Sequence, residues 1–321
     1  MNSNKRSSET GHWSGWTAQF FWILAGIALV FAFGSATRCH AQGLGWEGET
    51  GVFVTPLAYT ASSETEKYHP VVAYHYLDAG PVIGNFNEAS VEIGLGKRFE
   101  LGYTHEFHDQ GDQPLSYLWQ NGFEIFNGKF NVLPENSFKR NWMPAISVGF
   151  IARNGVRNVG DYEGTATAVS PNTSGHTNGD IYGVGSKLLK NRFVPVLLTG
   201  GVRGTDAELW GMGGSAPNWK ACAFGSAAFV FKMPYKSTLI LASEAAQQPH
   251  HPYGFTGANG SVPLNIPTTL TYAARFIPSA KYKVNFDVGV AQIAGQVWSD
   301  AADGINLKAR HQIGVQVSYG F

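Results

Sequence analysis

The sequence has little charge and little cysteine. Only 14% of its 321 residues are charged, and 23 basic residues balance 23 acidic ones. A neutral chain offers no basic surface for phosphate backbones, so we expect no nucleic-acid partner. Of the two cysteines, Cys39 lies in a segment that we expect to be removed. Cys222 alone cannot form an internal disulfide, which excludes a disulfide-stapled fold.

Long apolar runs are also missing, with one exception near the N-terminus. Residues Phe20–Phe33 form an apolar stretch that follows two basic residues, a pattern typical of a secretory signal peptide. We expect residues 1–41 to be this signal, cleaved after Ala41 or, as a second choice, after Ala36. The alternative is an uncleaved helical anchor. No apolar run of eighteen or more residues follows, so the sequence predicts no transmembrane helix beyond the leader.

The remaining chain consists of short segments in which apolar and polar residues alternate. In "QIGVQVSYGF" (312–321), every second residue from Ile313 to Phe321 is apolar. A period of two indicates a β-strand with one apolar face. Similar segments lie at 70–79, 88–97, 99–108, 121–134, 143–153, 180–189, 193–204, 219–232, 237–246, 269–278 and 282–294. Those at 219–232 and 237–246 are more uniformly apolar, so their facing is ambiguous.

These strands are about as long as a tilted strand that crosses a bilayer. Their polar faces carry mostly small residues and glycine, of which the chain has 39. A sheet that spans a bilayer must close on itself, because an open edge would leave peptide groups unpaired in hydrocarbon. The sequence therefore predicts an all-β fold, an antiparallel transmembrane β-barrel in the bacterial outer membrane.

Connection lengths set the number of strands. Tight turns at 96–99, 190–193, 233–236 and 278–282 alternate with long polar loops, the arrangement of short periplasmic turns and longer outer loops. From residue 70 to residue 321 we count twelve strands, which begin and end on the periplasmic side. Residues 42–69 are then a separate N-terminal segment that enters the lumen as a plug or lies at the periplasmic mouth. The alternative is a barrel of fourteen strands in which this segment forms the first hairpin.

The combination of a leader, "TGVFVTPLAY" (50–59), strands such as "ISVGFIARN" (146–154) and the closing "GVQVSYGF" (314–321) resembles an uncharacterised family of proteobacterial outer-membrane barrels. It also shares its opening and ending with barrels proposed for exopolysaccharide export or for uptake of aromatic compounds. The resemblance implies a barrel over most of residues 46–321. The family has no established catalytic residues, so it implies none here.

No residue pattern indicates catalysis or a metal site. In "HEFHD" (105–109), His105 and His108 point to opposite faces of a strand and cannot ligate one ion together. The pair His250 and His251 lacks a neighbouring cysteine or carboxylate. Strand serines have no histidine at a matching height, as a hydrolase nucleophile would need. We therefore predict no enzymatic activity, no cofactor and no metal.

The candidate functional residues are the charged side chains that strand parity turns toward the lumen. They are Glu92, Glu106, Arg153, Lys187, Arg203, Arg275, Lys283 and Asp287. Strand direction puts Lys187, Arg275 and Lys283 near the periplasmic mouth, with Glu92 and Asp287 closer to mid-height. Such charges either pair with one another and fill the interior, or set the selectivity of a water-filled path. Both roles stay open at this point.

The sequence thus favours a passive channel or transport component for small solutes. The alternative is a non-conducting accessory barrel whose outer loops bind a partner or a surface polysaccharide. Expected partners are outer-membrane lipid, lipopolysaccharide and the barrel-assembly machinery, to which the terminal aromatic Phe321 would act as a signal.

Overall fold

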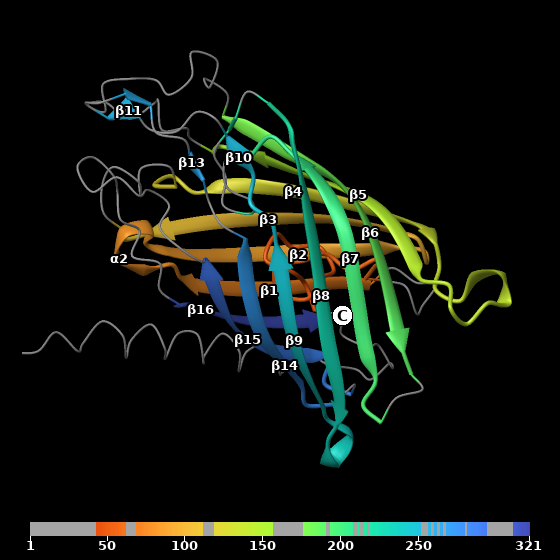
Figure 1. Cartoon of the computed structure of the whole chain (residues 1–321). Helices are drawn as coiled ribbons and strands as arrows, with labels where there is room; N and C mark the ends of the chain where they lie inside the picture. The colour runs from red at the N-terminus through yellow and green to blue at the C-terminus, as the bar shows by residue number, and fades with distance from the viewer. Residues whose placement is uncertain are drawn as a thin grey trace, which may run out of the picture. The chain divides into compact units, whose positions relative to one another are not determined.

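The computed structural model describes the protein over residues 43–61, 69–111, 119–156, 176–190, 193–207, 211, 215–216, 218–251, 256–257, 260–261, 264–265, 268–279, 281–293 and 311–321 (Figure 1). The predicted signal segment 1–41 lies outside these residues, as do residues 62–68. Among the described residues, no helix is long and apolar enough to cross a membrane.

Twelve strands form one closed antiparallel barrel, as the sequence predicts. Each strand pairs with the next one along the chain that belongs to the barrel, and the last pairs with the first. The twelve are β1 (His69–Asp78), β2 (Asn85–Leu95), β3 (Phe99–Asp109), β4 (Phe123–Leu133), β5 (Ala145–Asn154), β6 (Thr177–Leu189), β7 (Val196–Thr205), β8 (Lys220–Lys232), β9 (Thr238–Ala246), β14 (Thr269–Ile277), β15 (Val284–Ile293) and β16 (His311–Gly320).

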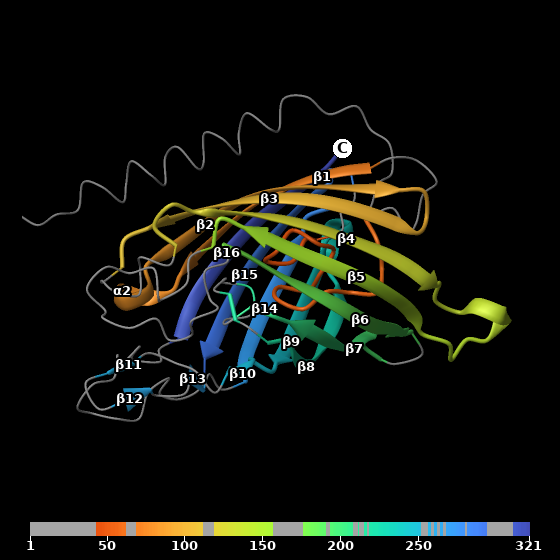
Figure 2. The same ribbon diagram turned by 90° about the horizontal axis from the view of Figure 1, so that it is seen from above.

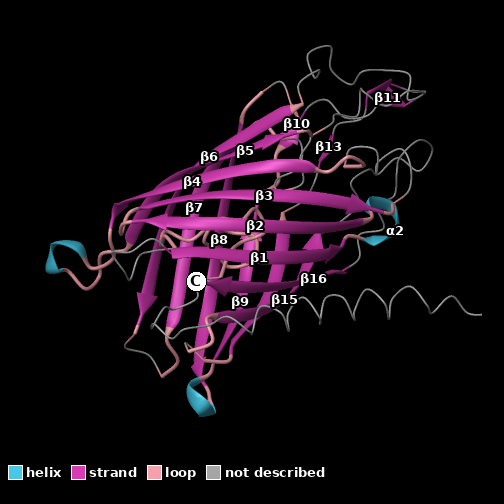
Figure 3. Cartoon of the chain, turned by 180° about the vertical axis from the view of Figure 1, so that it is seen from behind, coloured by secondary structure: helices cyan, strands magenta, loops and turns pink. Residues whose placement is uncertain are grey.

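The other elements are short and lie in the connections, so the described chain is mostly strand (Figure 3). Between β9 and β14, β10 (His250–His251) pairs with β13 (Leu264–Asn265), and β11 (Thr256–Gly257) pairs with β12 (Gly260–Ser261). Helix α2 (Gly80–Ile83) joins β1 to β2, and single 3-10 turns occupy Ser137–Lys139 and Pro234–Lys236.

The connections differ in length between the two ends of the barrel. At one end, the chain needs only a few residues to pass from β2 to β3, from β6 to β7, from β8 to β9 and from β14 to β15. At the other end, long segments follow β3, β5, β7, β9 and β15. The β4–β5 connection is an exception, because it is longer than the other turns at its end and extends away from the strands (Figure 1). Short turns mark the periplasmic end of an outer-membrane barrel.

The barrel wall has an apolar exterior and a largely polar interior. On β5, Ile146, Val148 and Phe150 are 40–48% exposed, whereas Ser147 is fully buried. The same alternation settles the two segments with ambiguous facing: Cys222 and Phe224 turn inward from β8, and Glu244 turns inward from β9. A closed sheet with this exterior pairs its backbone groups internally and presents side chains to lipid, so the protein is an outer-membrane β-barrel.

The seam between β1 and β16 closes the barrel. Residues pair from Val71 with Gly320 to Asp78 with Ile313. Beyond the last pair, the Phe321 amide donates a hydrogen bond to the carbonyl oxygen of Pro70, at 3.0 Å. The Phe321 ring lies edge-on against Tyr319 at 5.0 Å between centroids and is 53% exposed. The terminal aromatic thus lies at the closing seam with its ring accessible.

We predict that deletion of Phe321 lowers the yield of inserted protein, because it removes the exposed ring and the last seam hydrogen bond. Phe321→Trp keeps an aromatic ring and should insert like the unchanged protein. Heat-modifiable mobility of membrane fractions on a gel measures the inserted fraction. Equal insertion of the deletion and the Trp variant would refute a role for the terminal ring.

Candidate functional site

Residues 43–61, which we call the lumen segment, lie inside the barrel. Nearly all of them are buried, and their hydrogen bonds reach side chains on strands around the wall: β3, β4, β5, β6, β7, β9, β14 and β16. Seen from above, the segment lies within the ring of strands (Figure 2). Since β1 pairs directly with β16, the segment adds no strand to the wall, and the fourteen-stranded alternative does not occur.

The segment folds into compact turns rather than a strand. Isolated bridges join Leu44 to Thr50 and Gly51 to Pro56. Its backbone makes further internal bonds, such as the Trp46 amide to the Phe53 carbonyl at 2.8 Å. These bonds satisfy only part of the backbone, so the remaining peptide groups need partners on the wall. Wall side chains such as Ser147, Ser186 and Gln316 provide some of them, and four charged sites hold the rest of the segment.

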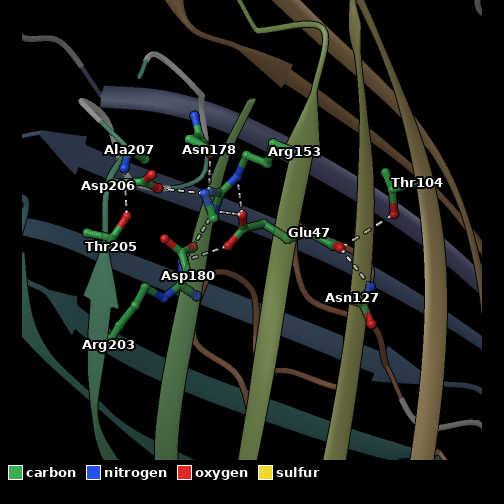
Figure 4. Close-up of polar contacts among 11 residues, drawn as sticks. Glu47, Thr104, Asn127, Arg153, Asn178, Asp180, Arg203, Thr205, Asp206 and Ala207 are labelled. Carbon is green, nitrogen blue, oxygen red and sulfur yellow. Dashed lines mark hydrogen bonds and ion pairs between the residues drawn. The ribbon is translucent and has the colours of Figure 1, made fainter. Parts of the chain in front are cut away.

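The first site is a buried cluster of two arginines and two carboxylates (Figure 4). Glu47 of the lumen segment accepts hydrogen bonds from Arg153 Nε at 2.9 Å and from Arg203 Nη1 at 2.8 Å, and it also contacts Arg153 Nη2. Asp180 Oδ2 accepts from both arginines, at 2.5 Å and 2.9 Å. The cluster is electrically balanced, and each carboxylate is held by two cations.

Glu47 is also held through its backbone. Its carbonyl oxygen accepts a hydrogen bond from Asn127 Nδ2 at 3.1 Å, and the Thr104 hydroxyl lies at 3.5 Å (Figure 4). The contacts of this one residue therefore extend from β3 to β7 across the lumen. Removal of the segment would break them together.

The second site is an ion pair between Lys129 and Glu100, at 2.6 Å, with both side chains fully buried. Lys129 Nζ also donates to the carbonyl oxygens of Thr50 and Tyr59, at 2.9 and 3.0 Å. Glu100 accepts from the amide and hydroxyl of Thr50 and from the Ala61 amide. The pair thus holds both a middle turn and the end of the lumen segment.

The third site is the carboxylate of Glu244. It accepts hydrogen bonds from the backbone amides of Phe53, Val54 and Thr55, and from the Thr55 hydroxyl at 2.6 Å. Three successive amides that converge on one anion form a nest of the kind that binds phosphate or carboxylate. The "VTP" element of the sequence is therefore the part of the lumen segment that wraps this wall carboxylate.

The fourth site is Arg275, which is paired with Asp287 at 2.7 Å. Its guanidinium donates to the carbonyl oxygens of Gly51 and Val52, at 3.2 and 2.5 Å. A Cβ atom on Gly43 would lie 1.9 Å from Arg275 Cζ, so a larger residue there would require the guanidinium to move. The arginine therefore binds both the wall carboxylate and the backbone of the lumen segment.

Glycines on the wall make room for the segment. Gly289 and Gly314 pair across β15 and β16, and the Phe53 ring packs on both. A Cβ atom would lie 2.9 Å from that ring at Gly289 and 2.7 Å at Gly314. Some of the glycines on the polar faces of the strands thus form a flat surface on which an aromatic side chain packs.

One side of the lumen carries carboxyl groups without such partners. Neither oxygen of Glu49, Glu88, Glu92 or Glu106 has a hydrogen bond, and all four side chains are buried. Burial and the neighbouring charge of Glu47 raise the pKa of Glu49, in the lumen segment, from 4.5 to about 8. At neutral pH its carboxyl group is thus mostly protonated in the closed structure.

The eight candidate residues from the sequence differ in what they contact. Arg153, Arg203 and Arg275 bind the lumen segment directly, and Asp287 does so through Arg275. Arg275 and Asp287 face each other in register, so Asp287 lies at the level of Arg275 and not nearer mid-height. Lys187 pairs with Glu135 at 3.0 Å, and that carboxylate also accepts from the Tyr59 hydroxyl.

For the remaining three candidates, the structure gives no hydrogen bond or ion pair to the lumen segment. Glu92 and Glu106 are the buried acids just described, and Lys283 is buried at the start of β15. Among the described residues, no group of three His, Cys, Asp or Glu side chains could hold a metal ion. His108 instead lies 2.7 Å from the Ile83 carbonyl oxygen and packs on Phe86.

Several residues of the site escaped the sequence prediction. Glu88 and Glu100 share the strand parity of Glu92 and Glu106, so parity could have found them. Glu244 lies in a strand too apolar for its faces to be assigned. Glu47 lies in a segment without strand periodicity, so no pattern marked it as the partner of two arginines.

Comparison with family models and with curated proteins gives no match. Among solved structures, the chain is similar to the KdgM porin, with 11% identity and a TM-score of 0.45, over 78% of this chain and 99% of that one. It is also similar to the NanC porin, with 7% identity and a TM-score of 0.42, over 78% and 98%. An outer membrane channel from Pseudomonas putida F1 has 12% identity and a TM-score of 0.45, over 79% and 95%. Likeness of this degree concerns the barrel fold alone.

We predict that Lys129→Met lowers the free energy of unfolding by about 3–5 kcal/mol, because it leaves Glu100 as a buried charge without its cation. Unfolding by guanidinium chloride in detergent measures the change. The double variant Lys129→Met/Glu100→Gln removes both charges and should regain a large part of the loss. A single variant that costs less than about 1 kcal/mol would contradict the pairing.

Proposed function

We propose that the protein is an outer-membrane channel for small polar solutes, and that the lumen segment is its gate. The observation that carries the proposal is the chemistry between segment and wall. Besides apolar packing such as Trp46 against Phe86, the segment is held by many hydrogen bonds and ion pairs to wall side chains such as Arg153, Lys129, Glu244 and Arg275. Water can replace such contacts one by one, whereas an apolar interface would have to be exposed.

The wall that the segment covers is suited to water. The inward positions include Asn131, Ser147, Ser186, Thr199 and Gln316, in addition to the charged residues. A twelve-stranded barrel is wider than the eight-stranded kind that side chains fill, and narrower than a sixteen-stranded porin. Without residues 43–61, a bore of this size and polarity would conduct small hydrated solutes.

The second candidate is an accessory barrel without a conducting path. The occupied lumen favours this candidate if the lumen segment stays permanently in place. The two candidates differ in what happens when the attachment of the segment is weakened. A gate then opens, whereas a permanent plug leaves the barrel silent or destabilises it. The absence of enzymatic activity stays a prediction under either reading.

We predict that Glu244→Gln raises channel open probability in planar bilayers, because a neutral amide binds the three amides of residues 53–55 less strongly than a carboxylate does. The unchanged protein should show rare openings. Glu106→Gln is the matched control, since it neutralises a buried lumen acid that makes no hydrogen bond to the segment. Silence at all voltages of both the Glu244→Gln protein and a variant that lacks residues 43–61 would reject the channel.

We also predict that open probability rises between pH 5 and pH 8. Release of the segment hydrates Glu49, whose pKa then returns from about 8 toward 4.5. In this range the closed state therefore binds more protons than the open state, and a rising pH favours opening. Glu49→Gln should flatten the dependence. An unchanged pH profile in that variant would show that Glu49 does not control the gate.

A further inference from the structure

The Arg153–Arg203 pair binds Glu47 as it would bind a separate carboxylate. The two arginines come from β5 and β7, and their donors converge on both oxygens of a side chain that belongs to the gate and not to the wall (Figure 4). On the wall itself, Asp180 forms ion pairs with both arginines. When the gate leaves, the two arginines thus keep the carboxylate of Asp180 and lose that of Glu47.

The wall near the arginine pair also carries a buried acid, Glu88, that has no hydrogen-bond donor. Glu88 is fully buried, and neither of its oxygens has a hydrogen bond. It interacts electrostatically with Glu106 and Glu47, which share its sign, and with Arg153. His75 lies in register with Glu88, with 3.7 Å between Nδ1 and Oε2, and neither of its ring nitrogens is hydrogen-bonded.

These unpartnered atoms are mostly acceptors. The Glu88 oxygens lack a donor, and so do those of Glu106, which lies in register with Glu88 on the neighbouring strand. A buried acceptor without a donor costs free energy. A positively charged donor beside the arginine pair would satisfy the Glu88 carboxylate.

We propose that the open lumen binds a small zwitterionic solute, with its carboxylate on Arg153 and Arg203 and its ammonium group toward Glu88. This inference rests on the proposed channel function and names the class of solute. In the closed structure, the Glu47 carboxylate stands in for the carboxylate of the solute. Solute and gate therefore compete for the same arginines, and a bound solute favours the open state.

Glu92 offers an internal comparison. It lies on the same strand and face as Glu88, four residues further along, or about 13 Å at the rise of a β-strand. It too is buried, but it interacts electrostatically with Glu100 and Lys129, and its side chain lies beside Asn127. Neutralising it changes the charge of the lumen as much as neutralising Glu88 does, without touching the proposed site.

The test uses the full mature protein with Glu47→Gln, which weakens the hold of the gate on the arginine pair. Calorimetry measures binding of alanine, and of propionate and ethylamine, which each keep one of its two charges. We expect alanine to bind about tenfold more tightly than either analogue, since each end gains a charge-assisted hydrogen bond. Adding Glu88→Gln should lower alanine affinity about tenfold and leave propionate unchanged. Adding Glu92→Gln should change neither.

Equal affinity for alanine and propionate would overturn the zwitterion site, and so would equal losses from Glu88→Gln and Glu92→Gln. Conductance of the same Glu47→Gln protein separates this failure from failure of the channel. If it conducts and does not bind alanine, the site is wrong and the channel stands; if it never conducts, the channel itself is wrong. Should Glu47→Gln not fold, Glu47→Asp replaces it, because the shorter side chain withdraws the carboxylate from the arginines. The same outcomes then decide.

Discussion

Closure of the sheet between β1 and β16 is the constraint on which the rest of the structure depends. Within a bilayer every peptide group of the wall must find its partner inside the barrel, and only a closed ring achieves this. Twelve strands then set the bore. That bore is too wide for the wall side chains to fill, so another part of the chain must fill the lumen of the closed structure. Residues 43–61 fill it, and the lumen charges are arranged around them.

The lumen charges have two roles at once in this arrangement. Wall pairs such as Lys129–Glu100 and Arg275–Asp287 neutralise each other and also bind backbone groups of the lumen segment. The choice between structural pairing and a selective path is therefore not exclusive. In the channel that we propose, the same arginines and carboxylates hold the segment in the closed state and would line a polar path once it leaves.

Charge is also unevenly divided across the lumen. Arginines on β5 and β7 hold the carboxylate of Glu47 in the lumen segment, whereas acids without hydrogen bonds line β2 and β3. This separation would be costly in a sealed interior that never contacts water, because the acids gain no hydrogen bonds there. It is the feature that favours a lumen which opens to polar solutes over a permanently filled one.

The sequence by itself determined the wall. Alternation in segments such as 143–153 predicts strands with one lipid face, and alternating connection lengths predict twelve of them with both ends on one side. These are local signals, since facing repeats every two residues and turns are read from neighbouring residues. The partners of the lumen charges were decided only by the tertiary structure. Glu47 lies 106 residues from Arg153 and 156 from Arg203, and closure of the barrel is what brings them together. Each turn of the lumen segment contacts a different strand of the wall. Its sequence therefore has no regular period, and no local pattern could predict its partners.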